Sequence, residues 1–447
     1  MSEKRIKVIG AGLAGCEAAY QASRLGVEVD LYEMKPDKRS PAHKSDDFAE
    51  LVCSNSLRSN QLNNAVGLLK AELEKLGSLI MRAAYVNEVP AGSALAVNRS
   101  EFSKYITAEI RANKNITVHH EEVTKIDPDE ITVIATGPLT SWDMARAIAE
   151  LTGGDELHFF DAAAPIIDFS SINTEKAFFA SRYGKGDPTD YLNCPLTKEE
   201  YDAFYNALIS APTAPLKDFD RELQEDLTVF EGCMPVEVMA SRGYDTLRFG
   251  PMKPVGLPVP ETGEDAFATV QLRRENIEGT MYNIVGFQTH LTFGAQKEVF
   301  GLIPGLENAE FFRYGVMHRN TYLNSPRLLT SVYSMREHPN LYFAGQMTGV
   351  EGYVESTSSG LVAGINAAMQ ALGREPVIFP KTTEIGALAH YISEGGISSS
   401  FQPMNANFGI IEPFPKKIKG GKNCRNLAYS ERSLEVIGSD FEFLTSL

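Results

Sequence analysis

The chain has 447 residues, 43% of them hydrophobic and 22% charged, and its formal net charge at pH 7 is −16. These values predict a globular protein with a large core and more than one domain. The negative charge argues against indiscriminate nucleic-acid binding, but it is compatible with an RNA that is held by a local basic patch. No apolar run approaches the ~20 residues that span a bilayer, no signal peptide precedes the first predicted strand, and the five scattered cysteines favour a reducing cytoplasm.

The N-terminal residues predict a strand, helix and strand that bind a dinucleotide. An apolar run precedes the pattern G-x-G-x-x-G, and the next apolar run ends at Glu33. The first glycine permits a tight turn, the second lets the backbone approach a pyrophosphate, and the third lets helix and strand pack closely. The phosphates would lie at a helix N-terminus, and Glu33 would accept the ribose hydroxyls. The predicted cofactor-binding residues of this unit are Gly10, Ala11, Gly12, Leu13, Ala14, Gly15 and Glu33.

The first half of the chain continues with alternating helices and strands. Helices are predicted over residues 13–25, 62–76 and 100–113, and strands over residues 116–119 and 131–135, from the spacing of apolar residues and the positions of glycine. Residues 34–60 are polar and rich in turn formers, so we expect a long loop that crosses the cofactor site. The strand at 131–135 is followed by Thr136 and Gly137.

The composition changes near residue 160, after which aromatic residues, prolines and mixed strand patterns continue to about residue 325. Within this region, Thr197 and Glu200 form a capping-box pattern that predicts a helix ending near Ser210. A strand over 341–345 and a helix over 356–372 then resume the earlier pattern. We therefore predict a discontinuous nucleotide-binding domain, residues 1–160 and 330–447, and an inserted α+β substrate domain, residues 161–329.

Two further segments indicate that the dinucleotide is FAD. Residues 132–137 resemble the strand and Ala-Thr-Gly element of flavoproteins with two dinucleotide-binding motifs, and residues 341–349 resemble their C-terminal FAD element. These segments add Gly137 and Gly345 to the predicted cofactor-binding residues. In such α/β folds, which are Rossmann-like and similar to glutathione reductase, a helix dipole stabilises negative charge on the reduced flavin. The sequence has no second G-x-G-x-x-G, so NADH or NADPH would bind only transiently over the flavin.

Blocks of sequence along nearly the whole chain resemble the TrmFO family, the folate- and FAD-dependent tRNA (uracil-5-)-methyltransferases. The main blocks are residues 41–58, 230–237, 246–256 and 345–356. The resemblance implies methylation of uridine 54 in the T loop of tRNA. It also implies that 5,10-methylenetetrahydrofolate gives the carbon, that reduced FAD gives electrons, and that NADH or NADPH reduces the flavin.

Two alternatives remain open at this stage. The related MnmG flavoproteins modify another tRNA uridine and carry a long C-terminal helical extension, for which this chain leaves no room after Gly345. A tRNA-binding flavoprotein without turnover is the other alternative.

The chemistry that the resemblance implies has to overcome the weak nucleophilicity of uracil C5, and one solution is addition of a thiolate at C6, which makes C5 able to attack an electrophilic carbon. Cys53 and Cys233 lie in the family blocks, and the family associates both positions with the active site. Cys53 follows a polar loop with Arg58 nearby, a setting that would favour its thiolate. A small buried residue is the alternative for each cysteine. Which of the two cysteines attacks uracil stays open, with Cys233 preferred. It also stays open whether the methylene carbon is transferred first to the flavin and then to uracil.

Several other residues complete the predictions. Cys16 lies at a packing position of the first helix, and the eight histidines show no metal-binding spacing, so no metal site is predicted. Aromatic residues could stack on an RNA base or pack in a core, namely Phe249, Phe287 and Tyr314. A basic segment near the C-terminus could contact tRNA phosphates, through Lys416, Lys417, Lys419, Lys422 and Arg425.

Overall fold

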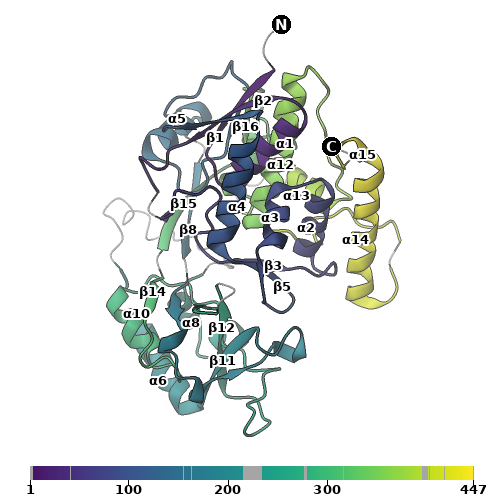
Figure 1. Ribbon diagram of the computed structural model, residues 1–447. Helices are drawn as coiled ribbons and strands as arrows, with labels where there is room; N and C mark the ends of the chain where they lie inside the picture. Colours follow the sequence, from purple (N-terminus) through teal and green to yellow (C-terminus); the bar gives the residue numbers. More distant parts are fainter. Residues whose placement is uncertain are drawn as a thin grey trace.

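The computed structural model describes residues 4–40, 42–154, 156–162, 164–214, 234–275, 279–315, 317–394, 401, 403–416 and 418–445. Its centre is a five-stranded parallel sheet in the order β16-β7-β1-β2-β6 (Figure 1). The strands are β1 (Arg5–Ile9), β2 (Glu28–Glu33), β6 (Ile116–His120), β7 (Thr132–Ile134) and β16 (Leu341–Phe343). Their apolar residues are buried, as expected for a parallel sheet covered on both faces.

Helices before and after the inserted region accompany this sheet. They are α1 (Leu13–Arg24), α2 (Ala65–Lys75), α3 (Leu79–Val86), α4 (Arg99–Ala112), α5 (Trp142–Thr152), α11 (Ser325–Leu328), α12 (Tyr353–Ala371), α13 (Glu384–Glu394), α14 (Gly421–Asp440) and α15 (Glu442–Thr445). Three of the predicted helices are confirmed as α1, α2 and α4, with ends shifted by at most a few residues. No helix among the described residues is both long and apolar enough to cross a membrane.

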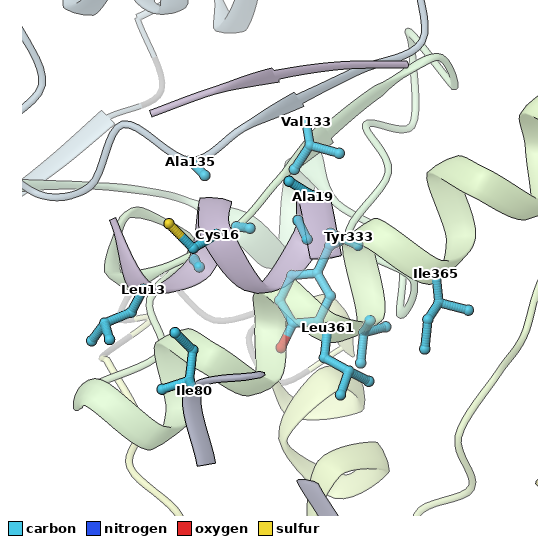
Figure 2. Close-up of a cluster of buried hydrophobic side chains, with 14 of the residues drawn as sticks. Leu13, Cys16, Ala19, Ile80, Val133, Ala135, Tyr333, Leu361 and Ile365 are labelled. Atoms are coloured by element: carbon cyan, nitrogen blue, oxygen red, sulfur yellow. The ribbon is translucent and has the colours of Figure 1, made fainter. Parts of the chain in front are cut away.

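Glycines on α12 bring it against α1. A Cβ added at Gly360 would lie 2.3 Å from the Ala14 carbonyl oxygen, and one added at Gly364 would lie 2.4 Å from that of Ala18. The two helices can therefore approach so closely only because these positions have no side chain. Figure 2 shows the apolar cluster at this contact, where Cys16 of α1 lies among buried side chains. Cys16 is fully buried, which confirms its predicted place in the core.

A small antiparallel sheet, in the order β3-β5-β4, contacts α2 and α3. Its strands are β3 (Ser56–Ser59), β4 (Glu88–Val89) and β5 (Ala94–Val97). The prediction of a loop over residues 34–60 was wrong at its end, because β3 occupies the last residues. The cause is tertiary: polar residues form β3 by pairing with β5, which lies more than thirty residues further along the chain.

The inserted region contains a six-stranded antiparallel sheet in the order β10-β11-β12-β13-β9-β14, with its own apolar core. The strands are β9 (Ile166–Asp168), β10 (Phe178–Phe179), β11 (Tyr191–Leu196), β12 (Ala268–Arg274), β13 (Met281–Ile284) and β14 (Phe311–Arg313). Its helices are α6 (Lys198–Ser210), α8 (Val236–Ser241), α9 (Thr246–Phe249) and α10 (Phe293–Phe300). The predicted capping box is confirmed, because the Thr197 and Glu200 side chains bond each other's backbone N–H at the start of α6.

Two antiparallel strands join the inserted region to the rest of the chain, β8 (Glu156–Ala162) and β15 (Met317–Leu323). They lie between the parallel-sheet region and the inserted sheet (Figure 1). One chain segment thus runs toward the second sheet beside the segment that returns from it. The division into a discontinuous nucleotide-binding domain and an inserted substrate domain stays a prediction, as do the boundaries at 160/161 and 329/330.

Candidate active site

A cavity opens at the carboxyl ends of the parallel strands, where ligands bind in open α/β sheets. With the open solvent at its mouth included, about 1170 Å³ of its space is free of protein atoms. Its lining comes from the β1–α1 turn, the ends of β2, β7 and β16, and the start of α12. The predicted cofactor-binding residues that line it are Gly10, Ala11, Gly12, Leu13, Ala14, Glu33, Gly137 and Gly345. Gly15 is absent from this lining.

The three glycines of the β1–α1 turn have different roles. Gly10 has a φ of +98°, which L side chains rarely adopt. A Cβ at Gly15 would lie 1.7 Å from the Gly10 carbonyl oxygen, so Gly15 acts by close packing behind the cavity. A Cβ at Gly12 would meet no protein atom within 4 Å. The fold itself therefore has room for a side chain at Gly12, and that room lies where a cofactor phosphate would approach the backbone.

The carboxylate of Glu33 is held in place at the end of β2. One oxygen accepts a hydrogen bond of 2.9 Å from the Ala11 N–H, and the other accepts one of 3.0 Å from the Lys35 N–H. Each oxygen keeps capacity for a further hydrogen bond. A buried carboxylate that is fixed in this way and lines the cavity suits the hydroxyls of a ribose.

The C-terminal element brings a second helix N-terminus to the cavity. The N–H of Gly345, which has a φ of +85°, donates to the Ser359 hydroxyl at 2.7 Å. Helix α12 begins at Tyr353, three residues before the predicted start at Ser356, and both of these residues line the cavity. The positive end of the α12 dipole thus faces the space for an isoalloxazine. Gly12 leaves its backbone uncovered for a phosphate, and the Glu33 carboxylate is fixed for a ribose. Together with the N-terminus of α12, these residues fit FAD.

Cys53 directly follows Val52, which lines the cavity. The hydroxyl of Tyr353 accepts hydrogen bonds from the backbone N–H groups of Cys53, at 2.7 Å, and Ser54, at 3.2 Å. Burial raises the pKa of the Tyr353 phenol, and the neighbouring Cys53 thiol adds to this shift. The first residue of α12 therefore fixes the position of the Cys53 backbone relative to the cavity.

Arginines from distant segments hold the carbonyl side of the same loop. Arg99 donates to the carbonyls of Leu51, at 2.8 Å, and Cys53, at 3.4 Å, and Arg313 donates to that of Val52. Arg99 belongs to α4, whereas Arg313 ends β14 of the inserted sheet. The loop is thus held from both the parallel-sheet region and the inserted region.

Arg58, the cation that the sequence analysis placed near Cys53, forms an ion pair with the buried carboxylate of Glu355. The guanidinium groups that interact electrostatically with Cys53 include those of Arg99, Arg273 and Arg313. No local pattern could have identified them, because they are separated from Cys53 by 46 or more residues along the chain.

A buried ion pair accompanies this arginine cluster. Arg99 donates to Glu275 through Nε at 2.6 Å and through a terminal nitrogen at 3.2 Å. Burial lowers the pKa of Arg99, but the charge of Glu275 outweighs this effect and the net shift is upward. Arg273 donates to the Ser54 hydroxyl at 2.8 Å, and burial lowers its pKa. Three guanidinium groups and the carboxylate of Glu275 therefore interact with the Cys53 loop or with one another.

Cys233 lies outside the described residues, but the segment that follows it is described. The Val236 N–H donates to the Gln288 carbonyl at 2.7 Å. The buried Glu237 carboxylate accepts from the Thr289 hydroxyl at 2.8 Å and from the His290 N–H at 2.7 Å. Burial raises the pKa of Glu237 and lowers that of the His290 imidazole. Residues 234–237 are thus joined to residues 288–290.

The other candidates of the sequence analysis have different surroundings. Phe287 is fully buried among aromatic rings of the inserted core, which excludes stacking on RNA, whereas Phe249 is 84% exposed. Tyr314 stacks between two other rings. Of the predicted basic segment, Lys417 lies outside the described residues, and the described members are Lys416, Lys419, Lys422 and Arg425. Among the described residues, no group of His, Cys, Asp and Glu is arranged to hold a metal ion.

Comparison with known proteins adds relatives in sequence and in fold. The family model described as "Glucose inhibited division protein A" matches residues 5–375. A protein of Acetivibrio thermocellus named methylenetetrahydrofolate–tRNA-(uracil-5-)-methyltransferase TrmFO is 61% identical over 432 residues, which cover 97% of each chain. A protein of the same name from Bacillus cereus is 58% identical and covers 98% of this chain and 99% of its own.

Solved structures with the same fold include GidA from Aquifex aeolicus in two crystal forms. The TM-scores are 0.70 and 0.71, at 16% and 17% sequence identity. The match covers 99% of this chain and 74% and 76% of those chains. These structures confirm the predicted α/β flavoprotein fold.

Proposed function

The chain belongs to the glucose inhibited division protein A family and, at 58–61% identity over nearly its full length, to the TrmFO methyltransferases, and on this premise we propose how and where it acts on tRNA. The reaction is methylation of a tRNA uracil at C5, with 5,10-methylenetetrahydrofolate as the carbon donor and reduced FAD as the reductant. We propose that the target is uridine 54 of the T loop and that NADH or NADPH reduces the flavin.

The chain's own residues provide the FAD site. The backbone N–H groups at the start of α1 bind the pyrophosphate, and the bare backbone at Gly12 lets it approach. Glu33 accepts the ribose hydroxyls, and the N-terminus of α12 stabilises negative charge on the flavin ring. When bound, reduced FAD supplies the hydride that converts a methylene group into a methyl group.

We assign the nucleophile to one of the two cysteines of the family blocks, with Cys233 preferred. Its thiolate adds to uracil C6, so that C5 gains electron density and attacks the methylene carbon. A base then removes the C5 proton while the bond between the methylene carbon and the tetrahydrofolate nitrogen breaks, which leaves an exocyclic methylene on C5. Addition of a hydride to this methylene carbon forms the methyl group and releases the thiolate from C6. Cys53, held between Tyr353 and the arginine cluster beside the cavity, serves the same reaction centre. The observation that carries this proposal is that Cys53 follows Val52 and that its backbone N–H donates to the Tyr353 hydroxyl, because Val52 and Tyr353 both line the cavity.

The target base has to leave the T-loop structure before a thiolate can reach its C6, at a cost of about a few kcal/mol. The guanidinium groups around the Cys53 loop favour an approaching phosphate backbone. The described basic residues near the C-terminus offer further phosphate contacts.

The direct test incubates the FAD-loaded protein with unmodified tRNA, methylenetetrahydrofolate and NADH or NADPH, followed by nucleoside analysis. We expect 5-methyluridine, mapped to position 54, and a requirement for all three small molecules. A product digest without 5-methyluridine would exclude the proposal, and 5-methyluridine at another position would correct the target.

Cysteine variants then test the nucleophile. We expect Cys233→Ala to abolish methyl transfer while it retains the visible flavin spectrum, and Cys194→Ala to serve as a matched control because Cys194 is buried in the inserted core. Full activity of Cys233→Ala would remove the assignment. A wild-type protein that binds tRNA without methyl transfer, with unchanged tRNA binding in both Cys233→Ala and Cys53→Ala, would favour the tRNA-binding flavoprotein without turnover.

A further inference from the structure

A ladder of three aromatic rings lies on the inserted region, formed by Phe311, Tyr314 and Phe293. The rings of Phe311 and Tyr314 are 4.8 Å apart between centroids, with planes 11° apart. The rings of Tyr314 and Phe293 are also 4.8 Å apart, with planes 18° apart. The three rings are therefore stacked nearly parallel, one after another.

The ladder has a covered end and an open end. Phe311 is partly buried and packs against the apolar core of the inserted region. Phe293 is 56% exposed, although Tyr314 covers one face of its ring. The opposite face of Phe293 is therefore open to solvent. An exposed aromatic face at the end of a stack suits another flat ring, which removes apolar surface from water and adds a stacking interaction.

The ladder is connected to the Cys53 loop and to the described residues 236 and 237. Arg313, which lies between two ladder residues in the sequence, donates to the Val52 carbonyl beside Cys53. Phe293 follows residues 288–290, which are bonded to Val236 and Glu237. The ladder therefore belongs to the part of the inserted region that is bonded to the Cys53 loop.

The charge near the open end also suits a nucleotide. Phe293 is the first residue of α10, and Lys297 lies one helical turn further on the same face, where its side chain is exposed. A base on the Phe293 ring would place its backbone phosphate within reach of this ammonium group. Alternation of a stacking ring and a basic side chain is the usual pattern of single-stranded RNA binding.

We propose that the open face of Phe293 is a stacking platform for a base of the substrate RNA next to the methylated uridine. This inference rests on the proposed function for the identity of the RNA. It assigns to the inserted region a role in holding the opened T loop, which the parallel-sheet region does not supply. A folate ring or a second protein chain as the occupant would be a different result and is excluded or established by the test.

The test uses the full-length FAD-loaded protein and an RNA hairpin with the sequence of the tRNA T arm. The Kd for the hairpin, the KM for tRNA and the KM for methylenetetrahydrofolate are measured for Phe293→Leu and Phe293→Tyr. Phe312→Leu is the matched control, because Phe312 is equally exposed at 56% and makes no ring contact among the described residues.

We expect Phe293→Leu to raise the Kd for the hairpin and the KM for tRNA by about 5- to 100-fold, the range for loss of one stacked base. The KM for methylenetetrahydrofolate should stay unchanged, Phe293→Tyr should restore RNA binding, and Phe312→Leu should behave as wild type. The proposal is overturned if Phe293→Leu binds the hairpin as well as wild type, or if only the folate KM rises. A wild-type protein that binds the hairpin through Phe293 but makes no 5-methyluridine would refute the proposed function and leave the platform standing.

Discussion

Substitution of Gly12 separates the needs of the fold from the needs of the cofactor. Because a Cβ at Gly12 would touch no protein atom within 4 Å, Gly12→Val should fold without a steric clash. Gly12 is the N-cap residue of α1, and replacing it with valine costs about 1 kcal/mol, since β-branched residues are poor N-caps. The protein without FAD should therefore remain folded.

Binding of FAD should fail in the same variant. The two methyl groups of valine would occupy the ~3 Å across which a backbone N–H bonds a phosphate oxygen. Loss of two such hydrogen bonds to a charged group costs about 3–6 kcal/mol, or a rise in Kd on the order of 10²- to 10⁴-fold. We expect a colourless, inactive protein after purification.

The assay pairs flavin absorbance of the purified variants with urea unfolding of their FAD-free forms. Gly15→Ala is the contrasting variant, because its Cβ would lie 1.7 Å from the Gly10 carbonyl oxygen, and we expect a loss of about 3 kcal/mol or more in the free energy of unfolding. A Gly12→Val protein that binds FAD as tightly as wild type would refute the placement of the pyrophosphate. A Gly12→Val protein that is unfolded without FAD would refute the steric argument.

Three further predictions concern buried polar groups. Glu275→Ala leaves the buried Arg99 guanidinium without its carboxylate, and urea unfolding should show a free energy of unfolding lower by about 3–5 kcal/mol. A decrease below about 1 kcal/mol would contradict the buried ion pair. Tyr353→Phe removes the acceptor of two backbone N–H groups and should cost about 2 kcal/mol in the same assay, whereas an unchanged urea midpoint would show that water replaces the hydroxyl. Burial raises the pKa of Glu72 from 4.5 to about 7. The contribution of Glu72 to stability is therefore fully present below pH 4.5 and is lost as the pH rises through about 7. Glu72→Gln should flatten the profile of unfolding free energy across that pH range, and an equal slope in both proteins would show that other groups cause it.

Local sequence patterns were enough to predict the elements that line the cofactor cavity. The glycine pattern and the apolar runs around it predicted β1, α1 and β2, because the tight turn at Gly10 and the contact of Gly15 with the Gly10 carbonyl oxygen are local. The contact of Gly10 with the Ala135 carbonyl oxygen, 2.6 Å from an added Cβ, is tertiary. The capping box of α6 was predictable for the same reason, since Thr197 and Glu200 bond each other's backbone across one helical turn. Helices α13 and α14 were missed, as was β3, whose pairing partner is remote in sequence.

The sequence by itself determined the nucleotide-binding turn, the kind of cofactor and the family of the enzyme. These depend on short segments whose side chains and glycines can be recognised without knowledge of their tertiary contacts. Only the tertiary structure decided what surrounds Cys53. Arg99, Arg313 and Tyr353 meet at its loop from three separate elements, and Arg58, its neighbour in sequence, turns to Glu355 instead. The physical reason is that a buried charge or a backbone carbonyl takes the partner that folding brings within hydrogen-bond distance, and that partner has no fixed separation along the chain.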